Sequence, residues 1–559
     1  MRTCRSYSNP WTQEAEGFGF RKDEEKIMKI RLSKKAEPLS GVNPVLAAVM
    51  ERLRKEPTAW TEKLRKEPGT FVDLEKDIHV AFGQMADQVV AGILAEVTQT
   101  NEFADSAKEK VATGRNAAGK ATHRSGEPRP LRIRLLGGLI LFVTTLYCAP
   151  MARTGKKRGR EGGGLYPECG ELGIMEGKSP ALVRHIGRLT ALLPYATVRE
   201  QLLADGMKIT RKEVHGIGVH AGQVALTYRC RELEAYRAGT LAAGAGKGKR
   251  FGAQLDGGRG KIRTRTRKQS GFGKFKTRTR RFKSDWREPK VIIVYEMDET
   301  GNMKKKTEPI IDGTFRGGPD EIMEILAMRL HQVGASEADV VAFRSDGAPW
   351  IWDRLDWVIK RLGLKDAQVS KGLDWCHAAH HVSLALSHVS AGAERKRLFK
   401  KYRKWLKAGQ WAEVMYALIK MGLAADLPWE SELWTATNYL DRHGSAGHLD
   451  YATFRRRKLP LGSGAIESTI RRVVNLRIKG NSIHWLEANA EAMLLLRGLV
   501  LSGRWDRTFA AMLKSFATDR RLDWAIKSPD MVSQLNAKVE IKPPKAQSVD
   551  AIAICGAAA

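Results

Sequence analysis

The sequence is poor in cysteine, and its few cysteines do not have the spacing of a metal-binding motif. Its 559 residues include six cysteines, and no two of them form a CxxC pair. This spacing argues against a disulfide framework and against a zinc ribbon. Scarce, unpaired cysteine is typical of a reducing compartment, so we expect a cytoplasmic protein.

Long hydrophobic runs are also missing. The most apolar stretch, residues 135–150, is shorter than the roughly 20 residues that a membrane-spanning helix needs. Its Gly137-Gly138 pair, between β-branched and aromatic residues, predicts a β-hairpin instead. Charged residues dominate the N-terminus, where no secretory signal is visible. We therefore expect no membrane partner.

Acidic residues are too few to balance the basic ones. The chain has 62 Asp and Glu against 95 Lys and Arg, a formal net charge of +33. Such an excess is typical of proteins that act on a polyanion, most often nucleic acid. A polybasic membrane-surface protein is the alternative, but neither an amphipathic anchor nor a lipidation motif is present.

Composition and periodicity divide the chain into five parts. They are a disordered tail (1–40), an N-terminal helical region and linker (41–128), a β-hairpin with a helix-turn-helix-like DNA-binding region (129–235), an α/β catalytic domain (250–510) and a C-terminal helix with a disordered tail (511–559). The catalytic domain contains an expected all-α insertion at about 389–455.

Residues 180–225 predict a helical unit that contains two helices joined by a short turn. The first helix ends at Gly206, and Thr210 with Glu213 has the Ser/Thr-x-x-Glu signature that opens the second. Because the second helix starts with Arg211 and Lys212, the pair matches a DNA-binding helix-turn-helix. An ordinary helical hairpin is the alternative.

Two acids end strands that are far apart in the sequence. From residue 252 the expected order is a strand with Asp256, two strands, a helix, a strand that ends at Asp346, a helix, a strand and a helix. This is the order of the ribonuclease-H-like mixed sheet, in which the first and fourth strands are neighbours. Asp256 and Asp346 should therefore meet. Asp298 is expected to be a turn residue, and Asp353 and Asp356 surface charges.

A third acid, Glu467, follows a Gly-Ser-Gly segment in which Ser463 is expected to cap a helix. The helix dipole favours the ionised carboxylate there. Basic residues on the same helix could bind phosphates: Arg471, Arg472, Arg477 and Lys479. Three carboxylates can hold a pair of Mg²⁺ ions, which activate the nucleophile and stabilise the leaving oxygen in phosphodiester chemistry. Mn²⁺ can substitute.

A strongly basic segment separates the first two strands of this domain. Residues 259–287 carry 13 Lys and Arg and a single acid, so we expect a solvated loop or a phosphate-binding arm. Interleaved aromatic residues suit stacking on bases. The candidate DNA-binding residues are Arg259, Lys261, Arg263, Arg265, Arg267, Lys268, Arg278, Arg280 and Arg281.

Several stretches resemble bacterial insertion-sequence transposases of the DDE type, in the ISKra and ISLre groups. The similar stretches include "AQLDGG", "FRSDGAPWIW", "LDWCHAAHH" and "LPLGSGAIESTIRRVVNLRIKG", within residues 130–510. The resemblance implies that Asp256, Asp346 and Glu467 are the metal-binding catalytic triad. It also implies that Asp374 and His377 form a D-x-x-H signature that supports catalysis.

Other roles remain open for the histidines and tryptophans. His377 could be a core residue, and His377, His381 and His388 recur at helical spacing, as in a zinc site. Four tryptophans of the insertion are expected to be mostly core, with base binding as the alternative: Trp405, Trp411, Trp429 and Trp434. Trp485 is a possible supporting residue.

The sequence thus predicts a Mg²⁺-dependent transposase that cleaves double-stranded DNA at terminal repeats and joins the 3′-hydroxyl to target DNA. A dimer or larger assembly on DNA, associated with the nucleoid, is expected. The alternatives are a catalytically silent DNA-binding remnant and a structure-specific nuclease on the same fold.

Overall fold

The computed structural model describes residues 28–30, 44–98, a few positions between 100 and 109, 123–150, 166–265, 282–480 and 483–518. Apart from strand β1 (Met28–Ile30), the expected tail 1–40 lies outside these residues, as does the chain after 518. Within the described parts, no helix has both the length and the apolar character needed to span a bilayer.

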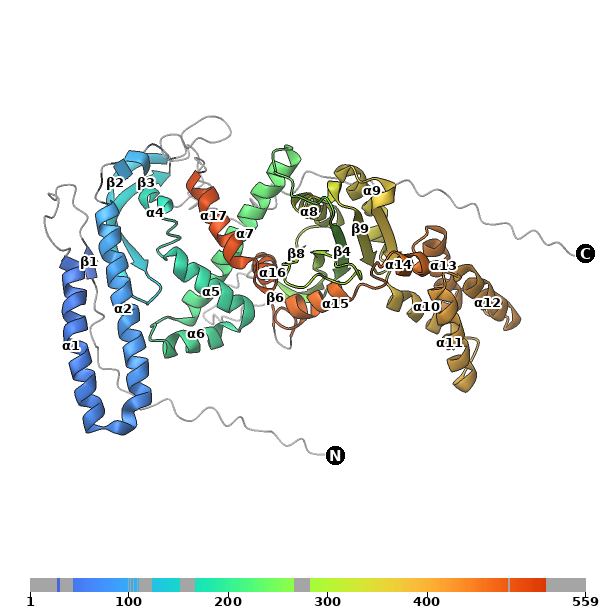
Figure 1. The fold of residues 1–559 in the computed structure, drawn as a ribbon, viewed down its shortest axis with the longest axis horizontal. Helices are drawn as coiled ribbons and strands as arrows, with labels where there is room; N and C mark the ends of the chain where they lie inside the picture. The colour runs from blue at the N-terminus through green and yellow to red at the C-terminus, as the bar shows by residue number, and fades with distance from the viewer. Residues whose placement is uncertain are drawn as a thin grey trace, which may run out of the picture.

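The N-terminal region begins with two long helices, as the periodicity predicts. Helix α1 (Pro44–Lys66) and helix α2 (Phe71–Thr98) are joined by the short 3₁₀ helix η1 (Pro68–Thr70) and lie side by side (Figure 1). Asp87 of α2 accepts hydrogen bonds from the backbone N–H groups of Gly137 and Leu139, at 3.0 and 2.9 Å. The helical pair is therefore fixed to the turn of the following hairpin.

The hairpin predicted around the two glycines is confirmed. Strands β2 (His123–Arg134) and β3 (Ile140–Pro150) are antiparallel, and Gly138 has a φ of 91°, a conformation that glycine adopts without strain. Strand β1 adds to β3 in parallel, giving the order β1-β3-β2. Strand β2 starts within the segment expected to be a linker, so the hairpin is longer than the sequence suggested.

A helical unit follows the hairpin. Its members are α4 (Pro167–Glu171), α5 (Pro180–Leu192), α6 (Tyr195–Ala204) and α7 (Arg211–Arg237). The capping box between Thr210 and Glu213 is present. Helix α7 buries fourteen of its residues, and its fully exposed basic side chains, those of Arg211 and Lys212, lie at its start.

The centre of the molecule is an α/β unit around a mixed five-stranded sheet. Its strands are β4 (Arg250–Gly257), β7 (Lys290–Glu296), β8 (Ile310–Thr314), β9 (Val340–Ser345) and β10 (Val369–Leu373). They lie in the order β10-β9-β4-β7-β8; the first three are mutually parallel, and β7 is antiparallel to both its neighbours. The predicted succession of strands and helices is confirmed.

Side chains alternate between the two faces of this sheet, and each face has its own core. Phe251, Ala253 and Leu255 of β4 face one core, to which α7, α8 (Pro319–Gln332) and α9 (Pro349–Leu362) contribute. The opposite core contains residues of α10 (Trp375–Ser387), α15 (Gly464–Ile470) and α16 (Glu487–Leu501). Gln254 and Asp256, at the alternate positions, lie on this second face.

The remaining short elements complete the domain. They are the ribbon strands β5 (Gly260–Arg265) and β6 (Phe282–Arg287), the 3₁₀ helices η2 (Ala335–Glu337) and η3 (Asp366–Gln368), the π-helical segment η4 (Arg471–Asn475) and helix α17 (Trp505–Thr518).

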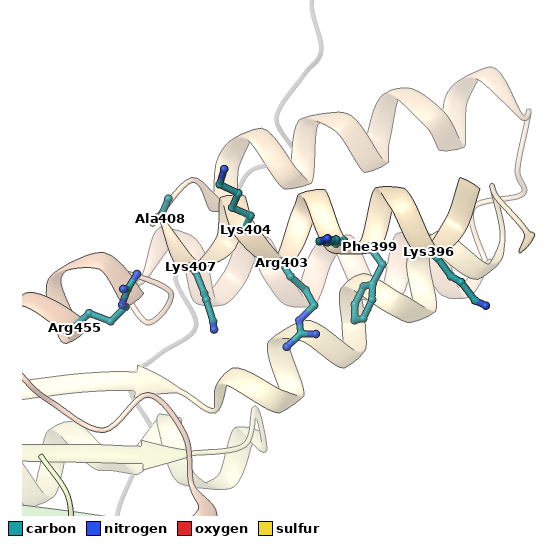
Figure 2. A pocket seen from close by; sticks show the side chains of 8 residues that line it. Lys396, Phe399, Arg403, Lys404, Lys407, Ala408 and Arg455 are labelled. Atoms are coloured by element: carbon teal, nitrogen blue, oxygen red, sulfur yellow. The ribbon is translucent and has the colours of Figure 1, made fainter. Parts of the chain in front are cut away.

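The all-α insertion is present between β10 with its helix α10 and the Gly-Ser-Gly segment. It consists of α11 (Gly392–Lys407), α12 (Trp411–Ala424), α13 (Glu432–Ser445) and α14 (Tyr451–Arg456). Trp405, Trp411 and Trp434 pack in its core, so the expectation that these tryptophans are mostly core residues is confirmed; Trp429 is the exception and is 70% exposed. Basic side chains of α11 and Arg455 of α14 line a surface hollow (Figure 2).

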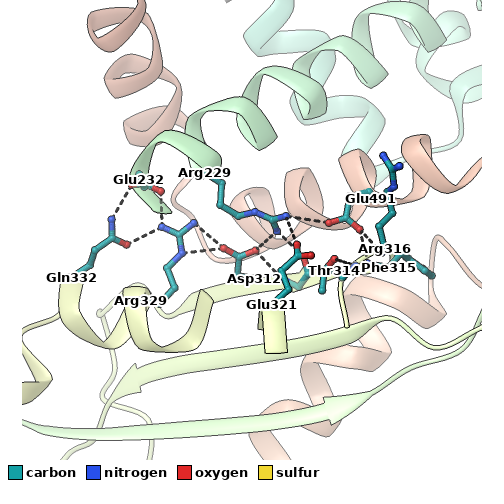
Figure 3. A network of polar contacts seen from close by, with 12 residues as sticks. Arg229, Glu232, Asp312, Thr314, Phe315, Arg316, Glu321, Arg329, Gln332 and Glu491 are labelled. Atoms are coloured by element: carbon teal, nitrogen blue, oxygen red, sulfur yellow. Dashed lines mark hydrogen bonds and ion pairs between the residues drawn. The ribbon is translucent and has the colours of Figure 1, made fainter. Parts of the chain in front are cut away.

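A buried network of charges joins α7 to the sheet (Figure 3). Asp312 of β8 accepts from Arg229 of α7 at 2.9 Å and from Arg329 of α8 at 2.7 Å. Arg229 also donates to Glu491 of α16 at 3.1 Å. Burial alone would raise the pKa of Asp312, but the two guanidinium groups bring it below its usual value. Each buried charge in this network is therefore stabilised by an oppositely charged partner.

Candidate metal centre

Two of the three predicted acids meet at the ends of neighbouring strands. In the parallel register of β4 and β9, Leu255 lies opposite Ser345, and the Ser345 hydroxyl donates to the Leu255 carbonyl at 2.7 Å. Asp256 and Asp346 are the next residues on each strand, so both carboxylates lie at the same sheet edge. The backbone N–H groups of Gly257 and Ala348 donate to them, at 2.6 and 3.1 Å.

The electrostatics of Asp256 reveal what surrounds it. Its pKa is raised to about 6, chiefly by burial and also by the negative charges of Asp346 and Glu467, while the Gly257 N–H and His377 act in the opposite direction. Asp346, His377 and Glu467 come from the end of β9, from α10 and from α15. The carboxylates therefore repel one another, a situation that a bound cation relieves.

A second group of ligand atoms shares His377 and Glu467 with the surroundings of Asp256. One ligand atom each of Asp374, His377 and Glu467 lies within 4.8 Å of the others, and among the described residues this is the one such group of His, Cys, Asp and Glu side chains. His377 thus belongs to both groups. Together with Asp256 and Asp346, these residues form what we call the acidic cluster.

Asp374 connects helix α10 to the Gly-Ser-Gly segment that precedes Glu467. It is buried, caps α10 by accepting from the His377 backbone N–H at 2.8 Å, and accepts with its other oxygen from both the backbone N–H and the hydroxyl of Ser463. Ser463 occupies the N-cap position of α15, as the sequence predicted, but its hydroxyl makes no capping hydrogen bond and donates to Asp374 instead. Both carboxylate oxygens of Asp374 accept hydrogen bonds, which connect the start of α10, where His377 lies, to the Gly-Ser-Gly segment.

Gln254 fixes the segment that carries Glu467. Its side-chain carbonyl accepts from the Ile466 backbone N–H at 3.0 Å, and its amide donates to the Tyr295 hydroxyl at 2.9 Å and to the Gly462 carbonyl at 3.3 Å. Gln254 lies two residues before Asp256 and on the same sheet face. Sequence analysis missed it, although a polar residue on the buried face beside an acid is a signal for such a role.

Replacing Gln254 by Leu is expected to lower the free energy of unfolding by about 1–3 kcal/mol, because buried backbone groups lose their partners. Gln201→Leu on the exposed side of α6 is the matched control and should change it by less than about 0.5 kcal/mol. Urea denaturation of both variants checks this. Equal stabilities would show that the Gln254 contacts contribute nothing.

The turn that follows Asp346 is held by the insertion. Arg442 of α13 donates to the Gly347 carbonyl at 3.0 Å, and the Trp352 indole donates to the Asp346 carbonyl at 2.6 Å. A side chain at Gly347 would collide with the ring of Tyr439, because an added Cβ would lie 2.1 Å from it. The insertion is therefore part of the support of Asp346.

Two buried histidines lie behind this turn. His448 stacks on Trp352 with ring centroids 4.1 Å apart, and its Nδ1 lies 3.1 Å from Nδ1 of His443. Burial lowers the pKa of His448 to about 3 and that of His443 to about 4. In the folded protein both imidazoles therefore stay neutral at pH values at which the same histidines of the unfolded chain already bind protons.

This difference predicts acid sensitivity. Between about pH 6.5 and 4 the unfolded chain binds protons that these two sites do not, so stability should fall as the pH falls, by about 1.4 kcal/mol per pH unit for each histidine. In the His448→Gln variant the free energy of unfolding should depend less on pH, because the contribution of one histidine is removed. Urea denaturation across this pH range checks it, with the exposed His79→Gln as control. Parallel pH profiles for all three proteins would contradict the prediction.

The zinc alternative is not supported. His381 stacks on Tyr439 at 3.7 Å between ring centroids, and His388 lies 3.3 Å from a carboxylate oxygen of Glu432. These contacts take the two imidazoles away from His377, so the three do not form a common ligand set. Asp298 accepts from the backbone of Thr300 and Asn302 and is a turn residue, as predicted.

The basic residues after Glu467 differ in position and in exposure. Helix α15 ends at Ile470, so Arg471 and Arg472 lie in η4, and Arg477 and Lys479 lie beyond it. Arg471 and Lys479 are exposed. Arg477 is buried, with its guanidinium 5.0 Å from the ring of Tyr195 and 5.2 Å from that of Trp485. Its assignment to DNA binding was therefore wrong, because aromatic rings cover it.

Trp485 is also an interior residue. It is buried and its indole donates to the Ile478 carbonyl at 3.1 Å, so it cannot stack on a base. Its backbone instead exchanges hydrogen bonds with Lys261 and Arg263 of β5, at 3.0 and 2.8 Å. Trp485 thus anchors the basic ribbon to the domain.

The described ends of the basic segment form an antiparallel ribbon and not the solvated loop that was one expectation. Strands β5 and β6 pair from Gly260–Arg287 to Arg265–Phe282. Arg259 and Arg263 are exposed, and Lys261 lies 5.0 Å from the ring of Trp286, which is itself exposed. The side chain of Arg265 and the whole of Arg267, Lys268, Arg278, Arg280 and Arg281 lie outside the described residues.

The cluster thus joins hard oxygen ligands and one imidazole at a sheet edge, beside exposed cations. Comparison of the chain with protein-family models, with curated proteins and with solved structures gave no match.

Proposed function

We propose that the protein is a metal-dependent DNA transposase of the DDE type. The observation that carries the proposal is the acidic cluster, in which the charges of Asp346 and Glu467, from two distant segments, act on Asp256 of a third. Structural acids are usually paired with cations; these three are gathered with each other and with His377. Such an arrangement is expected where cations bind.

The strand order supports a ribonuclease-H-like core for the same domain. The order β10-β9-β4-β7-β8, with its parallel and antiparallel pairs, is what that fold requires. The first and fourth strands of the domain, β4 and β9, are neighbours and deliver their acids to one edge. This proposal also accounts for the basic surfaces beside the cluster.

The donor set fits Mg²⁺ and, with the imidazole of His377 nearby, also Mn²⁺. Asp256, Asp346 and Glu467 would hold the ions, which supply an activated nucleophile and a stabilised leaving oxygen when bound. Gln254 and Asp374 keep the segment of Glu467 in place, and Arg471 is exposed at the start of η4, where it can pair with a phosphate. His377 would position the substrate strand.

We further propose that double-stranded DNA, both terminal repeats and target, is the substrate, and that a dimer or larger assembly brings two ends together. Nucleoid association in a bacterial cytoplasm would follow from these contacts and the net charge of +33.

The test is incubation of the full chain with Mg²⁺ or Mn²⁺ and linear DNA that carries the ends of its element. Metal-dependent nicks at the ends, followed by products joined to target DNA, are the expected result. Cleavage without joining would favour a structure-specific nuclease. Tight binding without cleavage in either metal would contradict the proposal and favour a silent DNA-binding remnant.

A further inference from the structure

The solvent side of α11 carries a continuous cationic face that none of the residues discussed so far uses. Eight of the sixteen residues of α11 are Lys or Arg, against one acid, Glu394. The residues that line the hollow recur at helical spacing: Lys396, Phe399, Lys400, Arg403, Lys404 and Lys407. The opposite side of the helix buries Leu398, Tyr402 and Leu406.

The lining cations are free for a ligand. All five are exposed, as is Arg455 of α14, which extends the hollow. Within the described part of the chain, the one acid of α11 pairs with Arg397, outside the hollow, and no acid forms an ion pair with a lining cation. Figure 2 shows Phe399, Arg403 and Lys407 projecting to the same side of the helix. Unneutralised charge at this density attracts a polyanion.

This face leads directly to the acidic cluster. Lys407 and Arg403 lie over the ring of Trp375, at 5.2 and 5.9 Å, and Trp375 follows Asp374 in the sequence. Asp374 belongs to the acidic cluster and accepts from the His377 backbone N–H, so the cationic face and the cluster are neighbours.

We propose that the exposed face of α11, with Arg455, binds the phosphate backbone of the DNA strand that enters the acidic cluster. From Lys396 to Lys407 the helix rises about 16 Å, which matches about five phosphates of one strand of B-DNA. Phe399, half-buried between the cations, offers an apolar surface for a sugar or a base. The insertion then has two functions: it supports the Asp346 turn and it holds substrate.

The inference rests on the proposed function for the identity of the strand, but its test needs no catalysis. Binding of a fluorescent linear DNA duplex by the full chain is measured without metal over a series of salt concentrations. The variant Lys400→Gln, Arg403→Gln, Lys404→Gln and Lys407→Gln removes four charges from the face. The slope of log K against log salt should become less steep by about 3–4, with affinity lower by about 10²–10³-fold.

The control removes the same number of charges at the opposite edge of the sheet, where Lys305, Lys306, Lys360 and Lys365 are exposed. Their replacement by Gln should leave the slope close to that of the unaltered chain. A charge-retaining variant (K400R, R403K, K404R and K407R) should bind normally and separates lost charge from lost folding.

Equal losses in the Gln variant and the control would overturn the inference, because they would reflect net charge alone. Binding by the Gln variant as tight as that of the unaltered chain would also overturn it, while leaving the proposed function standing. Absence of binding by the unaltered chain at low salt would overturn both.

Discussion

Replacement of Asp346 by Asn is expected to lower the rate of metal-dependent DNA cleavage by about 10³-fold or more. Metal ions supply several kcal/mol of transition-state stabilisation, and each 1.36 kcal/mol corresponds to tenfold in rate. Asn keeps an oxygen that accepts from the Ala348 backbone N–H, so the turn should remain folded. Single-turnover nicking assays measure the rate, and calorimetry with Mn²⁺ should show weaker metal binding.

Asp353→Asn is the matched control, because Asp353 is exposed on α9 and close in sequence. It should cleave and bind Mn²⁺ like the unaltered protein. Cleavage by Asp346→Asn at the control's rate would mean that Asp346 lies outside the catalytic site and that the triad is wrong.

The largest effect on stability is expected for Arg229→Met. Its guanidinium is 2% exposed and pairs with Asp312 and Glu491. Met fills similar space but leaves two buried carboxylates without this partner, and breaking a buried pair from one side costs about 3–5 kcal/mol. Urea denaturation should show this loss as a lower free energy of unfolding.

Arg507→Met removes an exposed pair with Glu308 and serves as the comparison. An exposed ion pair contributes at most about 1 kcal/mol, so the change should be small. Similar losses in the two variants would mean that the buried network adds no more stability than a surface contact.

The sequence was sufficient to predict the strand order and the meeting of Asp256 with Asp346. Local signals define the strands and the acids that end them, since apolar runs mark each strand and an acid directly follows or ends a run, and the expected ribonuclease-H-like order made the two acid-bearing strands neighbours. The capping box of Thr210 was predictable for the same reason, because its partner is three residues away.

Roles that depend on distant partners could not be predicted. Gln254 bonds to Gly462 and Ile466, more than 200 residues later; its position beside Asp256 indicates a polar role but does not identify those partners. Arg477 was assigned to the surface because it is charged, whereas two aromatic rings from separate segments bury it. The sequence contains these rings but does not show that they converge.

The charge network of Arg229 also has a mechanical consequence. Helix α7 begins with the exposed Arg211 and Lys212 and is tied to β8, α8 and α16 further along its length. A hinge at this place would have to expose or separate buried charges, at a cost of several kcal/mol. The start of α7 and the sheet edge therefore keep a fixed angle to each other. A DNA duplex that contacted both would have to bend, because the protein would not.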